Sequence, residues 1–154
     1  MKTNDINGNR LYKIAEVKLT YLTEIKSSER ITIKNSDDAA ALFFDAWDFN
    51  TIEHSEEVMM ILLNRANKVL GVVHLSKGGV VGSIIDIKVI LQYAIKANAS
   101  AVILAHNHPS GSLEASEADI RITERVREAL KLVDIQLLDH LILNKDEQYS
   151  AIQS

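Results

Sequence analysis

The chain has 154 residues, of which 47% are hydrophobic and 25% charged, values that are ordinary for one globular domain. It contains no cysteine, so disulfides and thiolate metal sites are excluded, and a reducing compartment such as the cytoplasm is expected. The formal charge is −4, whereas a nucleic-acid-binding module usually has an excess of basic residues. The sequence has no apolar run of about eighteen residues, which argues against a transmembrane helix and a membrane partner.

The first third of the chain is predicted to hold a flexible arm, two short strands and a helix. Residues 1–16 form the N-terminal arm, since most of them are polar, and we expect no secretory signal there. Residues 17–22 and 30–34 alternate β-branched and polar side chains, which is typical of strands. A helix is expected over 39–47, because Ser36 is suited to cap it and two acids follow directly.

The middle of the chain is predicted to form a hairpin, a turn and a second helix. Two apolar runs at 57–63 and 69–76 are separated by a short polar segment, which indicates a β-hairpin. Residues 77–83 are rich in glycine but lack the Lys-Ser/Thr pair of a phosphate-binding loop and the G-x-G-x-x-G spacing, so a turn with positive φ is expected. Apolar residues at helical spacing predict a helix over 86–97, with Asn98 as its end.

The last third alternates strands with the strongest helical pattern. Residues 101–105 are continuously apolar, as in a buried central strand. The segment 116–133 has one apolar stripe and a face of alternating charges, which is typical of a solvated helix surface. Strands follow at 136–143 and 149–152. This order of elements predicts one sheet with helices on its faces, in a single domain over residues 17–152.

The strongest chemical signal is a set of potential metal ligands directly after the predicted central strand. His106, His108, Ser116 and Asp119 form the pattern H-x-H-x7-S-x2-D. Alternate residues of an extended chain project to the same side, and Pro109 keeps His108 out of the helical region, so both imidazoles can converge. Catalytic zinc sites use three such nitrogen and oxygen ligands and leave one position for water. The sequence therefore predicts a divalent-metal site and metal-assisted hydrolysis.

Ser116 and Asp119 also fit a purely structural interpretation. A serine followed by an acid three residues later, before an apolar helix, resembles a capping box. Asp119 nevertheless shares the inward side of the helix with Ile122 and Val126, where a carboxylate without a partner is costly. A cation held by the two histidines would supply that partner. Capping and catalysis are compatible at Ser116.

A hydrolytic metal site also needs a general base close to the attacking water. Glu53, Glu56 and Glu57 lie at the start of the predicted hairpin, and position alone does not choose among them. The remaining histidines lack ligand spacing and are expected to be structural: His54, His74 and His140. Of these, His140 with its neighbour Asp139 is a candidate for orienting a metal ligand from behind.

The chain resembles the RadC family, a bacterial branch of the JAMM/MPN metalloprotease superfamily. The resemblance rests on residues 102–111 (VILAHNHPSG), on Ser116-x-x-Asp119 and on residues 137–140 (LLDH). It covers roughly residues 53–152, the motif-bearing part, and the full pattern is far more specific than a lone H-x-H. The family implies an α/β fold, a three-layer α/β/α sandwich with a mixed sheet similar to that of cytidine deaminases.

The resemblance also implies roles for individual residues. It implies one zinc ion per chain, with water as fourth ligand and three protein ligands: His106, His108 and Asp119. It implies that the Ser116 hydroxyl helps to stabilise the oxyanion. The family's upstream glutamate begins the strand two segments before the H-x-H, and Glu57 aligns best with it, ahead of its neighbour Glu56.

These features favour a zinc-dependent hydrolase of peptide or isopeptide bonds, with a peptide or protein as substrate. Glu57 would take a proton from the attacking water and deliver it to the leaving amine. The alternative is an accessory or DNA-binding module with a structural or vestigial metal site, suggested by the family's association with DNA repair. The acidic charge balance gives DNA binding no support. A phosphodiesterase is less favoured, because the ligand set provides for one metal whereas many nucleases use two.

Overall fold

The computed structural model describes residues 15–78 and 85–152. Within these residues the chain forms one five-stranded sheet, three α-helices and one short 3-10 helix. The strands are β1 (Glu57–Leu63), β2 (Val69–Lys77), β3 (Ala101–Asn107), β4 (Gln136–Leu143) and β5 (Tyr149–Ala151). The helices are η1 (Ser27–Glu29), α1 (Ser36–Ala46), α2 (Ile87–Lys96) and α3 (Glu117–Lys131).

The sheet is mixed, with the strand order β2-β1-β3-β4-β5. β1 runs antiparallel to both β2 and β3, β3 runs parallel to β4, and β4 runs antiparallel to β5. The predicted hairpin is confirmed, and the predicted central strand is the middle strand of the sheet, extended to Asn107. In the register of β1 and β3, Val58 lies opposite His106. Residues directly opposite each other share a face of the sheet, so these two side chains lie together.

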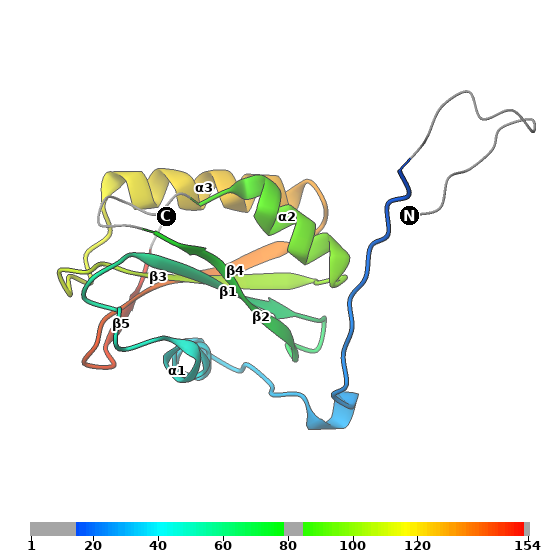
Figure 1. Ribbon diagram of the computed structural model, residues 1–154, viewed down its shortest axis with the longest axis horizontal. Helices are drawn as coiled ribbons and strands as arrows, with labels where there is room; N and C mark the ends of the chain where they lie inside the picture. Colours follow the sequence, from blue (N-terminus) through cyan, green and yellow to red (C-terminus); the bar gives the residue numbers. More distant parts are fainter. Residues whose placement is uncertain (1–14, 79–84, 153–154) are drawn as a thin grey trace, which may run out of the picture.

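Helices lie on both faces of the sheet, with α1 on one side and α2 and α3 on the other (Figure 1). Phe43 of α1 belongs to a buried cluster with Met59 and Ile61 of β1. Ile90 of α2 belongs to a second cluster with the alternate residue Met60 and with residues of α3. Every residue of β1 and β3 is buried, because these strands are covered on both faces. The predicted α/β class with a mixed sheet is confirmed.

Side-chain caps fix where the three α-helices begin. Asn35 caps α1, whereas the expected cap, Ser36, is the first residue of that helix. Asp86 caps α2, and Ser116 caps α3 in a complete capping box. Each cap supplies a side-chain oxygen to a backbone N–H that has no partner within its helix. The start of α3 carries Asp119, one of the predicted metal ligands.

The two strands predicted near the N-terminus are not formed. Residues 17–22 join no strand of the described chain, and of residues 30–34 only Thr32 forms a single bridge, to Lys68. Alternating β-branched side chains suit strand geometry, but a strand also needs a backbone ladder with a neighbouring strand. These residues form no such ladder, so the two predictions were wrong.

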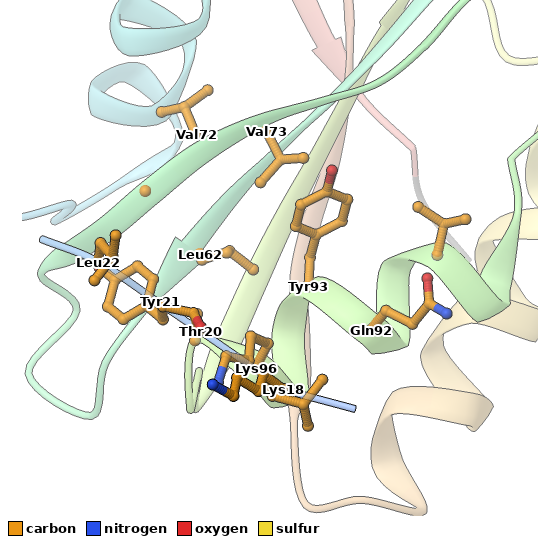
Figure 2. A pocket seen from close by; sticks show the side chains of 14 residues that line it. Lys18, Thr20, Tyr21, Leu22, Leu62, Val72, Val73, Gln92, Tyr93 and Lys96 are labelled. Carbon is orange, nitrogen blue, oxygen red and sulfur yellow. The ribbon is translucent and has the colours of Figure 1, made fainter. Parts of the chain in front are cut away.

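Residues 18–22 instead form one wall of a cavity of about 650 Å³ beside α2 and β2 (Figure 2). The Tyr21 hydroxyl donates a hydrogen bond to the carbonyl of Leu70 in β2. Tyr93 and Lys96 of α2 line the cavity as well. None of the predicted site residues contributes to it.

Three predictions are not settled by the described residues. The arm at 1–16 is described only at residues 15 and 16, and the glycine-rich loop at 77–83 only at residues 77 and 78. The domain limits of 17–152 stay a prediction. In the part of the chain that the structure covers, no helix has both the length and the apolar character that crossing a membrane requires.

A register shift in β4 turns His140 toward α3. The pairing of β4 with β3 skips Leu138. In a regular strand, Leu137 and His140, which are three residues apart, would face opposite sides of the sheet. The skip places Leu137 and His140 on the same face, the one covered by α2 and α3. Asp139 lies on the other face, where it accepts a hydrogen bond of 2.8 Å from the Ser36 hydroxyl.

Candidate metal centre

Four side chains converge near the C-terminal end of β3: Glu56, His106, His108 and Asp119. Each offers one ligand atom, and these four atoms all lie within 4.8 Å of one another. Imidazole nitrogens and carboxylate oxygens are the ligands that zinc takes in the absence of cysteine. The arrangement can therefore hold a divalent cation.

β3 and the turn that follows it position the two histidines. His106 lies on the face of β3 that packs against α3, and its side chain is only 3% exposed. His108 follows the strand, and its Nδ1 lies 3.0 Å from the carbonyl oxygen of Ser112. Its own carbonyl accepts a hydrogen bond of 2.8 Å from Gly111, which has a φ of +84° that favours glycine. Since a carbonyl can only accept, His108 carries a proton on Nδ1, and Nε2 is its ligand atom.

The two Nε2 atoms of His106 and His108 and the carboxylate of Asp119 form a compact triangle, in which each histidine contacts a different carboxylate oxygen. His106 Nε2 lies 3.0 Å from His108 Nε2, and His108 Nε2 lies 3.0 Å from Asp119 Oδ2. His106 Nε2 lies 3.4 Å from Asp119 Oδ1. Tetrahedral zinc with bonds of about 2.0–2.1 Å places its ligand atoms about 3.3 Å apart. The spacing of the triangle fits that ion.

Asp119 serves both the helix and the centre. Its Oδ2 accepts a hydrogen bond of 2.9 Å from the Ser116 backbone, and the Ser116 hydroxyl oxygen accepts one of 3.0 Å from the Asp119 backbone. This capping box was one of the two interpretations that the sequence left open, and it is confirmed. The same Oδ2 contacts His108, so the cap aims the carboxylate at the histidines. Capping and participation in the centre coexist.

The charges of the centre are coupled. The hydrogen bond with Asp119 raises the pKa of His108 above its ordinary 6.5, against the lowering effect of partial burial. Burial alone would raise the pKa of Asp119, but its contacts with His106 and His108 outweigh burial and hold that pKa well below its usual range. Burial lowers the pKa of His140 to about 3, so this ring is neutral. The Asp119 carboxylate is therefore charged and favours a positive charge on His108. A bound cation would meet the same attraction.

Comparison with known proteins assigns the chain to a family. The model of the RadC-like JAB domain matches residues 33–154. The chain belongs to this family. A UPF0758 protein of Flavobacterium johnsoniae is 40% identical over 97 residues, which cover 63% of this chain and 42% of the relative. A UPF0758 protein of Porphyromonas gingivalis is 45% identical over 94 residues, covering 61% and 41%. One of Neisseria gonorrhoeae is 39% identical over 123 residues, covering 79% and 53%.

Membership in the RadC-like JAB domain family confirms the resemblance found in the sequence and supports a place in the JAB/MPN superfamily. The chain spans about half the length, or less, of the curated relatives that it matches. The names of these relatives state no activity.

In this RadC-like JAB domain, the structure brings Glu56 to the centre and does not bring Glu57 there. Neighbouring residues of an extended chain face opposite sides, and Val58 shares the face of His106. Glu56 therefore lies on the side of the centre, and Glu57 on the side of α1. The buried Glu57 carboxylate lies 2.9 Å from Nδ1 of His74. The sequence favoured Glu57 over Glu56, whereas the carboxylate that lies with the other ligand groups is that of Glu56.

The other predicted candidates occupy different places. Glu53 pairs on the surface with Lys145 at 3.0 Å, and His54 is exposed in a turn. His140 does reach the centre from behind, because its Nε2 lies 2.8 Å from Nδ1 of His106. Asp139, its predicted companion, faces away toward α1.

Two buried polar residues near the centre were missed by sequence reasoning. Asn107, between the motif histidines, is fully buried and contacts the segment before β1. Thr123 is fully buried in α3, with its hydroxyl 2.6 Å from Nδ1 of His140. The available signal was position, since Thr123 lies four residues after Asp119 and three before Val126, on the apolar stripe.

A cavity of about 320 Å³ adjoins the centre. Its polar wall consists of Glu56, His106 and Asp119. The remaining lining residues are mostly apolar, with one cation: Val58, Ile85, Ala118, Ile122 and Arg125. A substrate group that enters this cavity can approach the ligand atoms of the centre.

Proposed function

We propose that the chain is a zinc-dependent hydrolase of peptide or isopeptide bonds. The observation that carries the proposal is the triangle of the His106, His108 and Asp119 ligand groups, with contacts of 3.0–3.4 Å and with Glu56 beside it. Two imidazoles and one carboxylate form a ligand set that leaves a position for water, as catalytic zinc sites require. The adjoining cavity supports access for a substrate.

Glu56 is the proposed general base. The chemistry that zinc supplies when bound is acidification of a water molecule and polarisation of the scissile carbonyl. The Glu56 carboxylate belongs to the group of atoms within 4.8 Å, close enough to take the proton of the attacking water. Returning that proton to the departing nitrogen completes the cleavage. The role expected for Glu57 from the family resemblance is therefore proposed for Glu56.

Ser116 is the proposed oxyanion donor. Its hydroxyl oxygen accepts from the Asp119 backbone, and that contact uses a lone pair rather than the hydroxyl proton. The proton remains available for the carbonyl oxygen of a substrate, which gains negative charge in the transition state. The Ser116 backbone N–H donates to Oδ2 of Asp119, a proposed ligand group, and this contact supports the role.

The cavity suggests the kind of residue that lies next to the scissile bond. Val58, Ile85 and Ile122 offer an apolar wall, and Arg125 supplies a positive charge. We therefore expect a peptide with an aliphatic side chain at this position.

A peptide-library cleavage assay with the zinc-loaded chain tests the proposal. We expect cleavage that stops when a chelator removes zinc and resumes when zinc is returned. Asp119→Asn keeps the size of the side chain but removes the charge that holds the metal, and should be inactive at matched protein concentration. Cleavage that is unaffected by both chelator and Asp119→Asn would overturn the proposal.

A further inference from the structure

We propose that Thr123 and His140 act as positioning residues that hold the proton of His106 on Nδ1 and leave its Nε2 free for the metal. The proton positions are inferred from the hydrogen-bond geometry alone. Their expected effect on metal affinity rests on the proposed function. The contacts run from the backbone of α3 through two buried side chains to a ligand atom.

The direction of the hydrogen bonds is set at Thr123. Its hydroxyl oxygen lies 2.7 Å from the carbonyl oxygen of Asp119 and 2.6 Å from Nδ1 of His140. A carbonyl can only accept, so the single hydroxyl proton of Thr123 points to Asp119. The lone pairs of the hydroxyl then face His140. Nδ1 of His140 must therefore carry a proton and donate it to Thr123.

His140 transmits this direction to His106. A neutral imidazole has one N–H, so a proton on Nδ1 of His140 leaves its Nε2 as an acceptor. That Nε2 lies 2.8 Å from Nδ1 of His106. His106 must then donate from Nδ1, and its Nε2 carries the lone pair. Nε2 is the atom that lies 3.0 Å from His108 and 3.4 Å from Asp119.

The series of contacts begins and ends at Asp119. Its backbone carbonyl receives the Thr123 proton, and its carboxylate meets Nε2 of His106 at the other end. Thr123, His140 and His106 are 0%, 1% and 2% exposed, so solvent has little access with which to replace any of these bonds. A buried polar chain is costly unless its groups are satisfied, and from the Asp119 carbonyl to Nδ1 of His106 each donor meets an acceptor.

The test uses Thr123→Val, which keeps the shape of the side chain and removes the hydroxyl. Without that acceptor, His140 is released to carry its proton on Nε2 and donate to Nδ1 of His106, which moves the His106 proton to the ligand atom. We expect zinc affinity to fall about 10- to 100-fold, the range seen when the partners of metal-binding histidines are removed. Thr123→Ser retains the hydroxyl and should restore most of the affinity.

Thr51→Val is the matched control, because the Thr51 hydroxyl also donates to a backbone carbonyl, that of Asp48, outside the centre. Zinc affinity is measured by competition with a chelator. Nitrogen-15 imidazole spectra of the zinc-free proteins, at about pH 8 where ordinary histidines are neutral, report which ring nitrogens carry protons. Thermal unfolding of the zinc-free variants checks that each one is folded.

The spectra decide the inference independently of the proposed function. We expect protonated Nδ1 atoms on His106 and His140 in the native chain, and a bare Nδ1 on His106 in Thr123→Val. A bare Nδ1 on His106 in the native chain, or zinc affinity in folded Thr123→Val equal to that of Thr51→Val, would overturn the inference. A native chain that has the stated protons but binds no zinc would instead overturn the proposed function.

Discussion

The side-chain oxygen of Asn107 accepts a hydrogen bond of 2.8 Å from the backbone N–H of Glu57. The amide nitrogen of the same side chain donates to the carbonyls of Ile52 and Ser55, the latter at 2.9 Å. The residue between the two motif histidines therefore holds the backbone on both sides of Glu56. This side chain couples the position of the proposed base to that of the metal ligands.

Replacing Asn107 with alanine should loosen that coupling. The buried backbone groups of Ile52 and Glu57 would lose their partner, at a cost of about 1–3 kcal/mol in the free energy of unfolding. Turnover should fall more than zinc affinity. The backbone on both sides of Glu56 loses its hydrogen bonds, whereas the side-chain contacts of His106 and His108 are kept. Urea unfolding and chelator competition measure the two effects. Asn50→Ala, in an exposed turn, is the control, and equal stability of the two variants would contradict the argument.

Exchanging the neighbouring acids for amides separates their roles. Glu56→Gln should lower kcat by about 10²- to 10⁴-fold, the usual contribution of a general base, while zinc content is kept. Glu57→Gln should leave kcat unchanged, because this carboxylate faces away from the centre and contacts His74. Steady-state kinetics on a peptide from the library distinguishes the two. Loss of activity in Glu57→Gln rather than in Glu56→Gln would return the role to Glu57.

Zinc binding should weaken as the pH falls. Asp119 raises the pKa of His108, so the zinc-free protein keeps a proton on this ring at a pH above the ordinary value of 6.5. Zinc must displace that proton, and the apparent affinity therefore falls by about tenfold for each pH unit below the raised pKa. Chelator competition between about pH 5.5 and pH 8.5 measures the slope. A decline that begins only below 6.5, or no decline at all, would argue against the His108–Asp119 coupling.

Ser116 has two roles that different substitutions can separate. Glycine is nearly as good a helix cap as serine, costing only a few tenths of a kcal/mol, whereas alanine costs about 0.5–2 kcal/mol. Both remove the hydroxyl, so both Ser116→Gly and Ser116→Ala should lower kcat, by about 10²- to 10³-fold if the oxyanion contact is made. Only the alanine variant should lose substantial stability on heating. Full activity of Ser116→Gly would show that the serine is a cap alone.

Much of the centre could be predicted because it depends on short-range geometry. The histidines lie two residues apart at the end of a strand, and Asp119 lies three residues after the helix cap. Such spacings fix the relative directions of side chains before any long-range contact is known. The hairpin, the middle strand and the three helices were predictable for the same reason, from local periodicity.

What could not be predicted depends on register and on partners. Whether Glu56 or Glu57 faces the centre is decided by the pairing of Val58 with His106, which joins segments almost fifty residues apart. The position of His140 depends on the register shift that skips Leu138. The segment 17–22 has the pattern of a strand but joins no strand pair of the described chain. In each case the deciding contact lies outside the local sequence.

Zinc quantification of the purified chain beside its His106→Ala variant tests the central claim most directly. The account predicts about one zinc per native chain, as three protein ligands around one ion require, and a large loss in the variant. Thermal unfolding in chelator would establish that the variant is folded. A native chain that remains free of zinc when zinc is supplied, or a folded variant that binds it as tightly, would contradict the account.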